Sequence, residues 1–315
     1  MTVSNVPAQR RGSWWSESLT GRSRRLGLSM AGPGTLLIIL FVAIPAVQTI
    51  IFSLQRVAPG EQGTFVGLAN YQRLFASSIF IQSLWTTVVF ALSFFLVSTV
   101  VGLGIGLLLN EPFRGRSIAR TLLIVPWATP WIVVGIMWHW FSDSSIGWLN
   151  GLLYQVGIVH AYYPFLADQR WAFILLVVAT SWRQSSLAGL LFLAGLQTIP
   201  KELMEAAALD GARTWQRFRY LTLPWLRPIA LVVAVINVLY GFLQFDVIFI
   251  MTEGGPGTST LVLSMLMYRE LFYFTNTGVG SAVAVVLALL ALVAGFAFVL
   301  LLHRNSSRFE LSANY

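Results

Sequence analysis

Four residues between positions 237 and 244 place polar groups on one face of an otherwise apolar segment. Asn237, Tyr240, Gly241 and Gln244 follow the spacing i, i+3, i+4 and i+7, which brings them together on an α-helix. Two amides, a phenol and a glycine supply neutral hydrogen-bond donors and acceptors, an aromatic surface and room for a ligand. This combination suits a hydroxyl-rich molecule such as a sugar. The alternative interpretation is hydrogen bonding between packed helices.

A second polar run, residues 182–186, interrupts another apolar segment. An ionisable or amide side chain at membrane depth usually faces a cavity or a partner helix, so Arg183, Gln184 and Ser185 are predicted to join the same ligand site. Arg183 needs a partner at that depth, and the candidates are Asp246, a carbonyl, a sugar hydroxyl or a residue of a second chain. Asp246 falls half a turn out of phase with the polar face, which makes it a weaker ligand candidate.

The sequence lacks the residues that most enzyme and nucleotide sites require. Cysteine is absent, which excludes disulfides, zinc–thiolate sites, iron–sulfur clusters and a cysteine nucleophile. A P-loop needs a lysine after a glycine-rich turn, and the only lysine, Lys201, follows a proline. The histidines are scattered, with no second histidine at helical spacing and no paired carboxylates to make a metal or acid–base site, so neither a catalytic nor a metal site is expected. Gly102, Gly104 and Gly106 lie in an apolar segment, where close helix packing explains them better than dinucleotide binding.

The composition indicates a membrane protein. Of 315 residues, 57% are apolar and 10% are charged, and the mean hydropathy is +0.74; a soluble domain has roughly a quarter charged residues. A helix needs about 20 apolar residues to cross a hydrocarbon core of ~30 Å. We therefore predict an all-α polytopic fold with a tail at 1–29, a transmembrane domain at 30–302 and a tail at 303–315. The six predicted spans are 30–52, 85–109, 118–141, 171–196, 228–250 and 278–302.

The distribution of basic residues predicts that both termini are cytoplasmic. Most of the 20 Lys and Arg residues lie in the two tails and in the loops after the second and fourth spans, as the positive-inside rule requires. The opposite loops hold only Arg56, Arg73, Arg170 and Arg269. This bias, together with anionic lipid headgroups, accounts for the net charge of +8, so no nucleic-acid partner is expected.

The N-terminal tail has two interpretations, an interfacial membrane anchor or a disordered solvated tail. Its basic and aromatic residues are Arg10, Arg11, Trp14, Trp15, Arg22, Arg24 and Arg25.

The predicted cytoplasmic loop at 197–227 carries a long motif. Pro200 is suited to begin a short helix and Gly211 to end it, and a second short helix is expected to stop at Leu223-Pro224. The motif consists of Glu205-Ala206-Ala207-Ala208-Leu209-Asp210-Gly211, then nine residues, then Leu221-Thr222-Leu223-Pro224. It resembles the EAA loop of the permease subunits of ABC importers, with Leu221 where that family usually has isoleucine.

The resemblance implies a type I ABC importer permease fold, in which this loop binds a cytoplasmic ATPase. The implied partners are a second permease, two cytoplasmic ATPase subunits, an extracellular sugar-binding protein or lipoprotein, and membrane lipid. ATP and Mg²⁺ would be bound by the ATPases, so neither a cofactor nor an enzymatic activity is expected for this chain. The positions to which the resemblance assigns ATPase coupling are Glu205, Ala206, Ala207, Asp210, Gly211, Leu223 and Pro224.

Two further segments are similar to carbohydrate importers of the maltose and glycerol-phosphate type. Residues 66–71 precede the second span, and residues 245–252, followed by a Gly-Gly-Pro signature, come after the fifth. The positions that match this group's sugar-contact face are the same four that the helical spacing selects. This resemblance implies a sugar, with a disaccharide as the expected substrate. The excess of arginine over lysine is typical of a GC-rich genome, and among the importers of such lineages the trehalose importers of actinobacteria are the first candidates.

The residues alone leave a different class open, an ion-coupled secondary carrier or an integral-membrane enzyme that works without ATPases. A carrier should show a relay of buried carboxylates and an internal repeat. Asp246 is the only carboxylate within the predicted spans, and no clear internal repeat is found.

Overall fold

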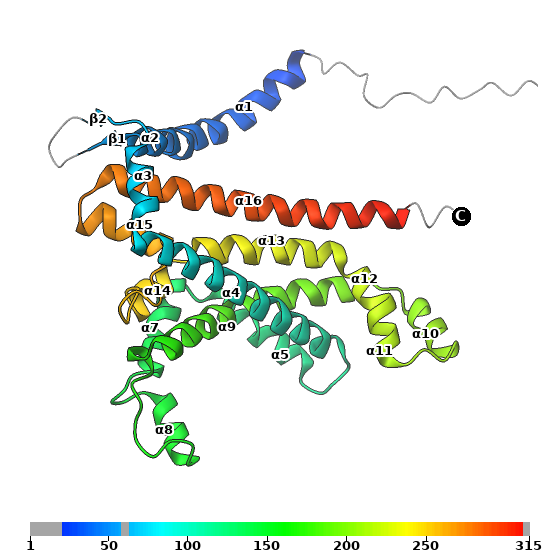
Figure 1. Cartoon of the computed structure of the whole chain (residues 1–315). Helices are drawn as coiled ribbons and strands as arrows, with labels where there is room; N and C mark the ends of the chain where they lie inside the picture. Colours follow the sequence, from blue (N-terminus) through cyan, green and yellow to red (C-terminus); the bar gives the residue numbers. More distant parts are fainter. Residues whose placement is uncertain (1–20, 58–62, 311–315) are drawn as a thin grey trace, which may run out of the picture. The chain divides into compact units, whose positions relative to one another are not determined.

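The computed structural model describes residues 21–57 and 63–310, with the side chains of 29–57 and 63–300 (Figure 1). Apart from two short strands, the regular secondary structure of the described residues is helical. The chain divides into a unit up to residue 49 and a unit from residue 50 onward, and the two are considered separately.

The described residues of the first unit form a continuous helical segment that becomes apolar after its first turns. It contains α1 (Gly21–Ile38), the π-helical η1 (Ile39–Ala43) and the start of α2 (Ile44–Ser53). The stretch Ser29–Ser53 is long and apolar enough to cross a membrane, which confirms the first predicted span. The helix begins at Gly21, so the last part of the predicted tail is helical, and the side chains of the predicted anchor lie outside the described residues.

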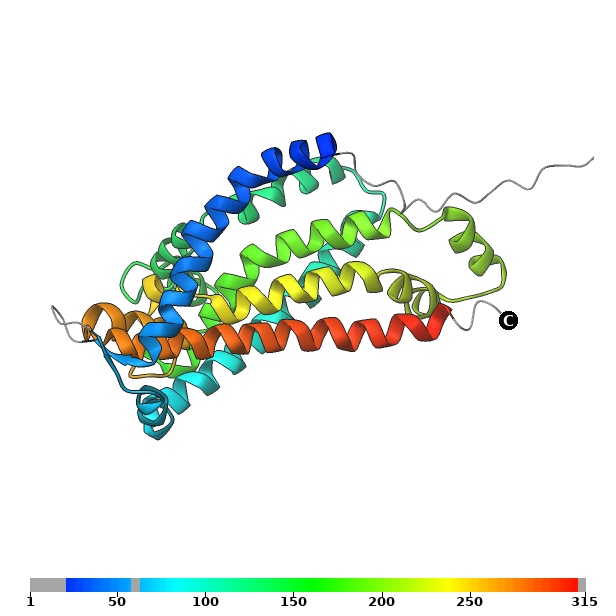
Figure 2. The same ribbon diagram turned by 90° about the horizontal axis from the view of Figure 1, so that it is seen from above.

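Four long helices form the core of the second unit. α4 (Ser78–Asn110) packs along α9 (Gln169–Leu196), α13 (Arg227–Leu243) lies against both, and α16 (Thr277–Glu310) packs against α13 (Figures 1 and 2). α4, α9 and α16 each satisfy the length and composition of a membrane span. They confirm the second, fourth and sixth predicted spans, although α16 continues to Glu310 into the predicted C-terminal tail.

Glycines let α4 and α9 approach closely. A Cβ at Gly102 would lie 2.5 Å from the Cβ of Ala188, and one at Gly106 would lie 2.8 Å from the Cβ of Phe192. Gly104 faces open space instead. The packing interpretation is therefore confirmed for two of the three glycines.

The third predicted span is broken rather than continuous. α5 (Arg116–Leu122) and α6 (Ile124–Ala128) are followed by α7 (Trp131–Phe141), and the two halves of this segment meet at 97°. The break falls at Thr129–Pro130. Proline has no N–H to donate and restricts the residue before it to extended backbone, so the α6 helix ends there.

The fifth predicted span is shorter than expected at its outer end. α13 stops at Leu243, Gln244 is extended, and a separate helix α14 begins at Asp246 (Asp246–Met251). At its other end α13 meets the segment Thr214–Trp225 at 67°. Counting each bent pair as one span gives six candidate spans among the described residues.

The shorter elements of the second unit gather at the two ends of the long helices (Figure 1). One end carries α10 (Lys201–Leu209), α11 (Thr214–Arg217), η3 (Phe218–Thr222) and α12 (Leu223–Trp225). The other end carries β1 (Gln55–Arg56), β2 (Thr64–Phe65), α3 (Ala69–Ala76), α8 (Trp148–Gln155), η2 (Phe165–Ala167), α14, α15 (Leu263–Tyr268) and η4 (Arg269–Tyr273).

Candidate functional site

Buried amides join three of the long helices. The Gln184 Nε2 atom on α9 donates to Asn237 Oδ1 on α13 at 2.9 Å, and Asn237 Nδ2 donates to Thr99 Oγ1 on α4 at 3.1 Å. Asn237 is 0% exposed and Gln184 is 1% exposed. In this conformation both amides therefore hydrogen-bond between packed helices, which is the alternative that the sequence left open.

Most of the other predicted ligand residues are buried in the same region. A Cβ at Gly241 would lie 2.9 Å from the Ala91 Cα, so α13 and α4 touch there. The Gln244 side chain is buried, and its carbonyl accepts a hydrogen bond from Ser264 Oγ at 2.6 Å. Ser185 is buried as well and donates to a carbonyl of its own helix. A role of these side chains in ligand binding stays a prediction.

Tyr240 and Arg183 differ from the buried group because they form a partly open cluster with Trp131. The Arg183 Cζ atom lies 4.0 Å from the centre of the Trp131 ring, and the Tyr240 ring centre is 5.9 Å from that of Trp131. Tyr240 is 44% exposed, whereas Arg183 and Trp131 are half-buried. An aromatic platform, a phenol and a guanidinium thus converge where α7, α9 and α13 meet, and we call these three residues the aromatic–arginine cluster.

The partner of Arg183 is a backbone carbonyl. Arg183 Nε donates to the Thr129 carbonyl at 2.7 Å, directly before Pro130 where the third span breaks. Carbonyls at a helix end have no partner within the helix, so a cation placed there satisfies one of them and complements the helix dipole. Among the described residues no ion pair joins Arg183 to Asp246, and of the candidate partners the carbonyl is the one observed.

Sequence reasoning missed Trp131 and Thr129 as neighbours of Arg183. The available signal was Pro130, which predicts an interrupted helix and therefore unpaired carbonyls near it. Sequence reasoning also placed Asp246 on a continuation of α13. This was wrong, because α13 ends before that residue and Asp246 lies in the first turn of α14, where a carboxylate suits the helix N-terminus.

The loop motif forms a helix with a well-defined end. α10 follows Pro200, and Gly211 adopts a left-handed φ of +79° after the helix. The Gly211 N–H donates to the Ala208 carbonyl at 3.1 Å, and the Ala212 N–H donates to the Ala207 carbonyl at 2.9 Å. These two bonds form a Schellman motif, which confirms that Gly211 terminates the helix.

Leu223-Pro224 does not end the second helix of the loop. Helical structure runs from Thr214 through η3 into α12, where Pro224 occupies one of the first positions, and the chain bends only after Trp225. The helical run thus continues through Pro224, which donates no N–H, directly after the π-helical turn η3. The expected stop at Leu223-Pro224 was therefore wrong, although both residues lie in the loop as predicted.

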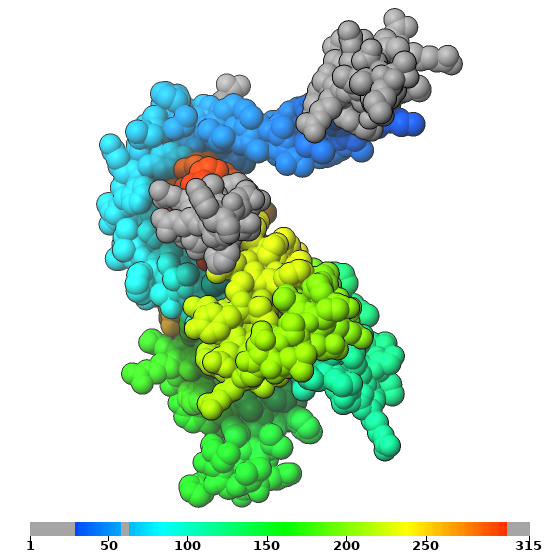
Figure 3. All heavy atoms as spheres, turned by 90° about the vertical axis from the view of Figure 1, so that its right-hand side faces the viewer, coloured from blue at the N-terminus to red at the C-terminus, as the bar shows by residue number. Residues whose placement is uncertain are grey.

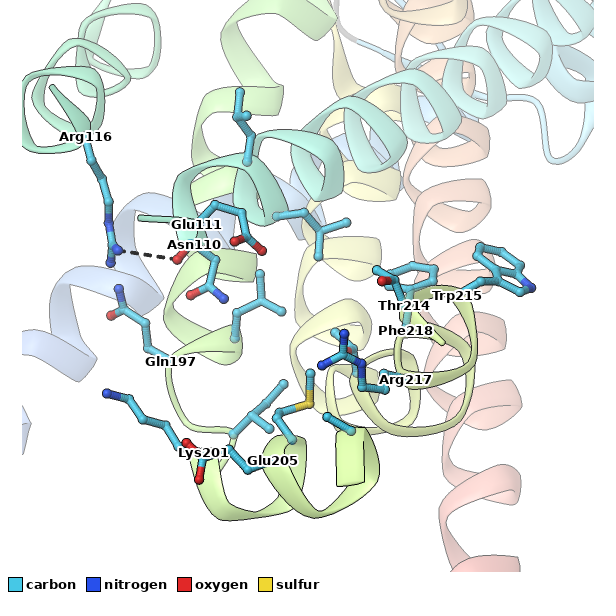
Figure 4. A pocket seen from close by; sticks show the side chains of 17 residues that line it. Asn110, Glu111, Arg116, Gln197, Lys201, Glu205, Thr214, Trp215, Arg217 and Phe218 are labelled. Atoms are coloured by element: carbon cyan, nitrogen blue, oxygen red, sulfur yellow. Dashed lines mark hydrogen bonds between the residues drawn. The ribbon is translucent and has the colours of Figure 1, made fainter. Parts of the chain in front are cut away.

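An open pocket of ≈ 1240 Å³ separates α10 from the ends of α4 and α9 (Figure 4). Lys201 and Glu205 line it from α10, whereas Trp215 and Phe218 line it from the second helical segment. Arg116 Nη1 donates to the Asn110 carbonyl at 3.4 Å on the α4 side.

Large apolar side chains lie uncovered near this pocket, among charged residues. Leu209 is 90% exposed and Trp215 is 69% exposed. Ala206, Asp210 and Gly211 are exposed too, and Ala207 is half-buried. Figure 3 shows the α10–α12 segment, in yellow-green, projecting toward the viewer at this end of the second unit.

Comparison with known proteins gives one consistent result. Residues 98–308 match the family described as the binding-protein-dependent transport system inner membrane component. The trehalose/maltose transport system permease protein of Thermococcus litoralis is 34% identical, over 88% of this chain and 93% of its own length. The sulfoquinovosyl glycerol transport system permease protein of Agrobacterium fabrum is 35% identical, over 88% of this chain and 90% of its own.

A solved structure shows the same fold. It is a chain of a bacterial ABC transporter involved in the import of alginate, with a TM-score of 0.78, 22% identity, and coverage of 90% of this chain and 96% of that one. This likeness confirms the predicted all-α importer permease fold. From the family match and the extent of its relatives, the chain belongs to the binding-protein-dependent transport system inner membrane components, and it is a transport subunit of the membrane rather than an enzyme.

Proposed function

We propose that this chain is one of the two permease subunits of an ATP-driven sugar importer and that its substrate is a disaccharide of the trehalose or maltose kind. The observation that carries this proposal is the similarity, over nearly the whole chain, to a relative named for trehalose and maltose transport. A second permease would complete the pore. An extracellular binding protein would deliver the sugar, in keeping with the family's dependence on such proteins.

We assign the first contact with sugar to the aromatic–arginine cluster. A sugar offers hydroxyl groups and an apolar ring face, which match the donors of Arg183, the phenol of Tyr240 and the faces of Trp131 and Tyr240. The bond from Arg183 to Thr129 uses Nε, which leaves the terminal nitrogens as further donors. Asn237 and Gln184 would reach a ligand only if α9 and α13 moved apart, because both amides are buried between these helices.

The proposed contact with the ATPases is the exposed surface around α10 and α11. Leu209 and Trp215 present uncovered apolar area beside Glu205, an arrangement typical of a protein interface. The rigid turn at Gly211 would let the loop move as a unit when the ATPases bind ATP and Mg²⁺. The basic residues of this end support a cytoplasmic position for it and for both termini.

Transport would then proceed by alternating access. Closure of the ATPases on ATP would move the loop, and the helices would expose the cluster first to one side of the membrane and then to the other. No bond of the sugar changes in this cycle.

The importer complex tests the proposal directly. We would co-express the chain with its candidate partners, purify it through a tag on this chain, and measure co-purification of an ATPase and ATP-dependent uptake of labelled trehalose into proteoliposomes. Uptake that needs no ATPase and follows an ion gradient would contradict the proposal in favour of a secondary carrier.

A conservative variant tests the sugar contact. Tyr240→Phe removes one hydroxyl, and a lost hydrogen bond of about 0.5–1.5 kcal/mol corresponds to a roughly two- to tenfold loss of uptake at low sugar concentration. The matched control is Tyr273→Phe, which changes a tyrosine that is 61% exposed on η4. Equal uptake by both variants would contradict the assignment of Tyr240.

A further inference from the structure

The chain makes a long excursion between α7 and α9. Residues 142–168 leave the end of α7, form α8 and η2, and return to the start of α9. Figures 1 and 3 show α8 to the side of the long helices rather than beyond them along their axes.

Internal hydrogen bonds hold this excursion in one conformation. Asn150 on α8 is 0% exposed, and its amide nitrogen donates to the carbonyls of Asp143 at 3.1 Å and Tyr163 at 2.9 Å. Its amide oxygen accepts the Tyr163 N–H at 2.9 Å. At the far end the Trp171 N–H and the Tyr163 hydroxyl donate to Asp168, and they hold the pKa of that carboxyl below its usual range.

Large apolar side chains dominate the exposed face of this segment, which also carries the polar residues Ser144, Ser145, Gln155 and His160. Residues 142–167 contain no lysine, arginine or glutamate, and their one aspartate, Asp143, accepts two backbone N–H groups. The exposed large side chains on this segment are Ile146, Trp148, Leu152, Tyr154, Val156, Ile158, Tyr162 and Tyr163. A soluble surface rarely exposes so many neighbouring apolar groups, so another phase or molecule should cover them.

Exposed tryptophans indicate that the segment lies at the boundary between the hydrocarbon core and the headgroups of the membrane. Trp140 in the last turns of α7 is 59% exposed, Trp171 at the start of α9 is 44% exposed, and Trp148 between them is 72% exposed. Exposed tryptophans and tyrosines at the ends of spans are enriched where the hydrocarbon core meets the headgroups. The exposed apolar surface of residues 142–168 therefore adjoins the exposed surfaces at the end of α7 and at the start of α9.

We propose that residues 142–168 form an interfacial anchor, in which the outer face of α8 and the following turn lies in the lipid headgroup region of the membrane. The scarcity of charge, with two aspartates and no lysine, arginine or glutamate in the segment, favours lipid over an aqueous binding protein, whose contact surface would be expected to have polar and charged rims. The lateral projection of α8 favours the plane of the membrane. Assignment to the outer leaflet rests on the proposed topology, whereas the contact with lipid does not.

The natural absence of cysteine makes a site-directed labelling test clean. We would introduce Val156→Cys, a position that is 67% exposed, attach a nitroxide, and assemble the labelled chain with its partner subunits in lipid nanodiscs. Collisions with molecular oxygen report lipid, and collisions with a neutral nickel chelate report water. Leu292→Cys on α16, 67% exposed, serves as the lipid reference, and Arg114→Cys, exposed in the turn between α4 and α5, serves as the aqueous reference.

The expected result is a ratio of oxygen to nickel collisions at Val156 close to that at Leu292 and well above that at Arg114. A ratio like that of Arg114 would overturn the proposal by placing the segment in water. Low collision rates with both reagents would also overturn it, by showing a protein cover such as the second permease. Ile158→Cys, at 66% exposure, replaces the first variant if that one fails to assemble. Since the test measures no transport, its outcome is separate from that of the proposed function.

Discussion

Replacing Asn237 with alanine should weaken the helix bundle more than it weakens sugar binding. The variant removes the hydrogen bonds to Gln184 and Thr99, and interhelical bonds in membrane proteins average about 0.6 kcal/mol each. It also leaves the buried Gln184 Nε2 without a hydrogen-bond acceptor, which costs about 1–3 kcal/mol. The sum is a loss of about 2–4 kcal/mol in the free energy of unfolding.

The assay combines stability and transport. Unfolding of the purified complex in detergent gives the change in stability, and uptake divided by the amount of assembled complex gives the intrinsic activity. Val232→Ala, on the exposed side of the same helix, is the control and should change stability by less than about 0.5 kcal/mol.

A double-mutant cycle with Gln184→Ala tests the pair itself. Gln184 Oε1 is buried without a hydrogen-bond partner among the described residues, so removing the whole side chain also removes an uncompensated group. The losses in the double variant should therefore be smaller than the sum of the single losses. Unchanged stability of Asn237→Ala with reduced uptake per complex would refute this reasoning and indicate direct contact of Asn237 with sugar.

Three further predictions concern backbone and charge. Gly102→Ala should destabilise the α4–α9 contact by about 1–3 kcal/mol, because the new Cβ would meet that of Ala188, whereas Gly104→Ala should be neutral or slightly stabilising in the same unfolding assay. Gly211→Val should lower sugar-stimulated ATP hydrolysis and uptake without removing the chain from the membrane, because a β-branched residue at a φ of +79° is strained. Asp168 has a lowered pKa when folded, so its stabilising effect is present above the unfolded pKa of about 3.9 and is lost as the pH falls through the folded value; Asp168→Asn should flatten the stability loss below about pH 4.

Each of these predictions has a contrary result. Equal stability of the Gly102 and Gly104 variants would remove the argument for close packing on one face of α4. Normal ATP hydrolysis and uptake in Gly211→Val would contradict a role of the turn in coupling. An unaltered acid profile in Asp168→Asn would show that other carboxylates dominate acid unfolding.

Features that depend on a few neighbouring residues could be predicted from the sequence. The lengths of the apolar segments predicted the spans, because a bilayer imposes a minimum length on any crossing helix. Gly211 predicted the end of α10, because only the residues next to it and its own left-handed backbone form the Schellman motif. The EAA-type motif predicted the family because its two blocks of residues lie at a fixed spacing within one loop.

Features that depend on contacts between distant segments required the tertiary structure. Helical spacing placed Asn237, Tyr240, Gly241 and Gln244 on one face, but it could not tell which neighbouring helix would cover that face. The structure buries Asn237 against Gln184 and leaves Tyr240 exposed beside Trp131. The spacing of residues along the sequence predicts which of them share a face of a helix, whereas the burial of that face depends on which other helices pack against it.

For Arg183, the sequence predicts the need for a partner and the tertiary structure determines which partner it is. The sequence required a partner, because a charge at membrane depth is costly when unpaired. Only the break of the third span at Pro130 brings the Thr129 carbonyl to within 2.7 Å of Arg183 Nε, 54 residues away along the chain. The need for a partner is therefore a property of the residue and its depth, while the identity of that partner is a property of the fold.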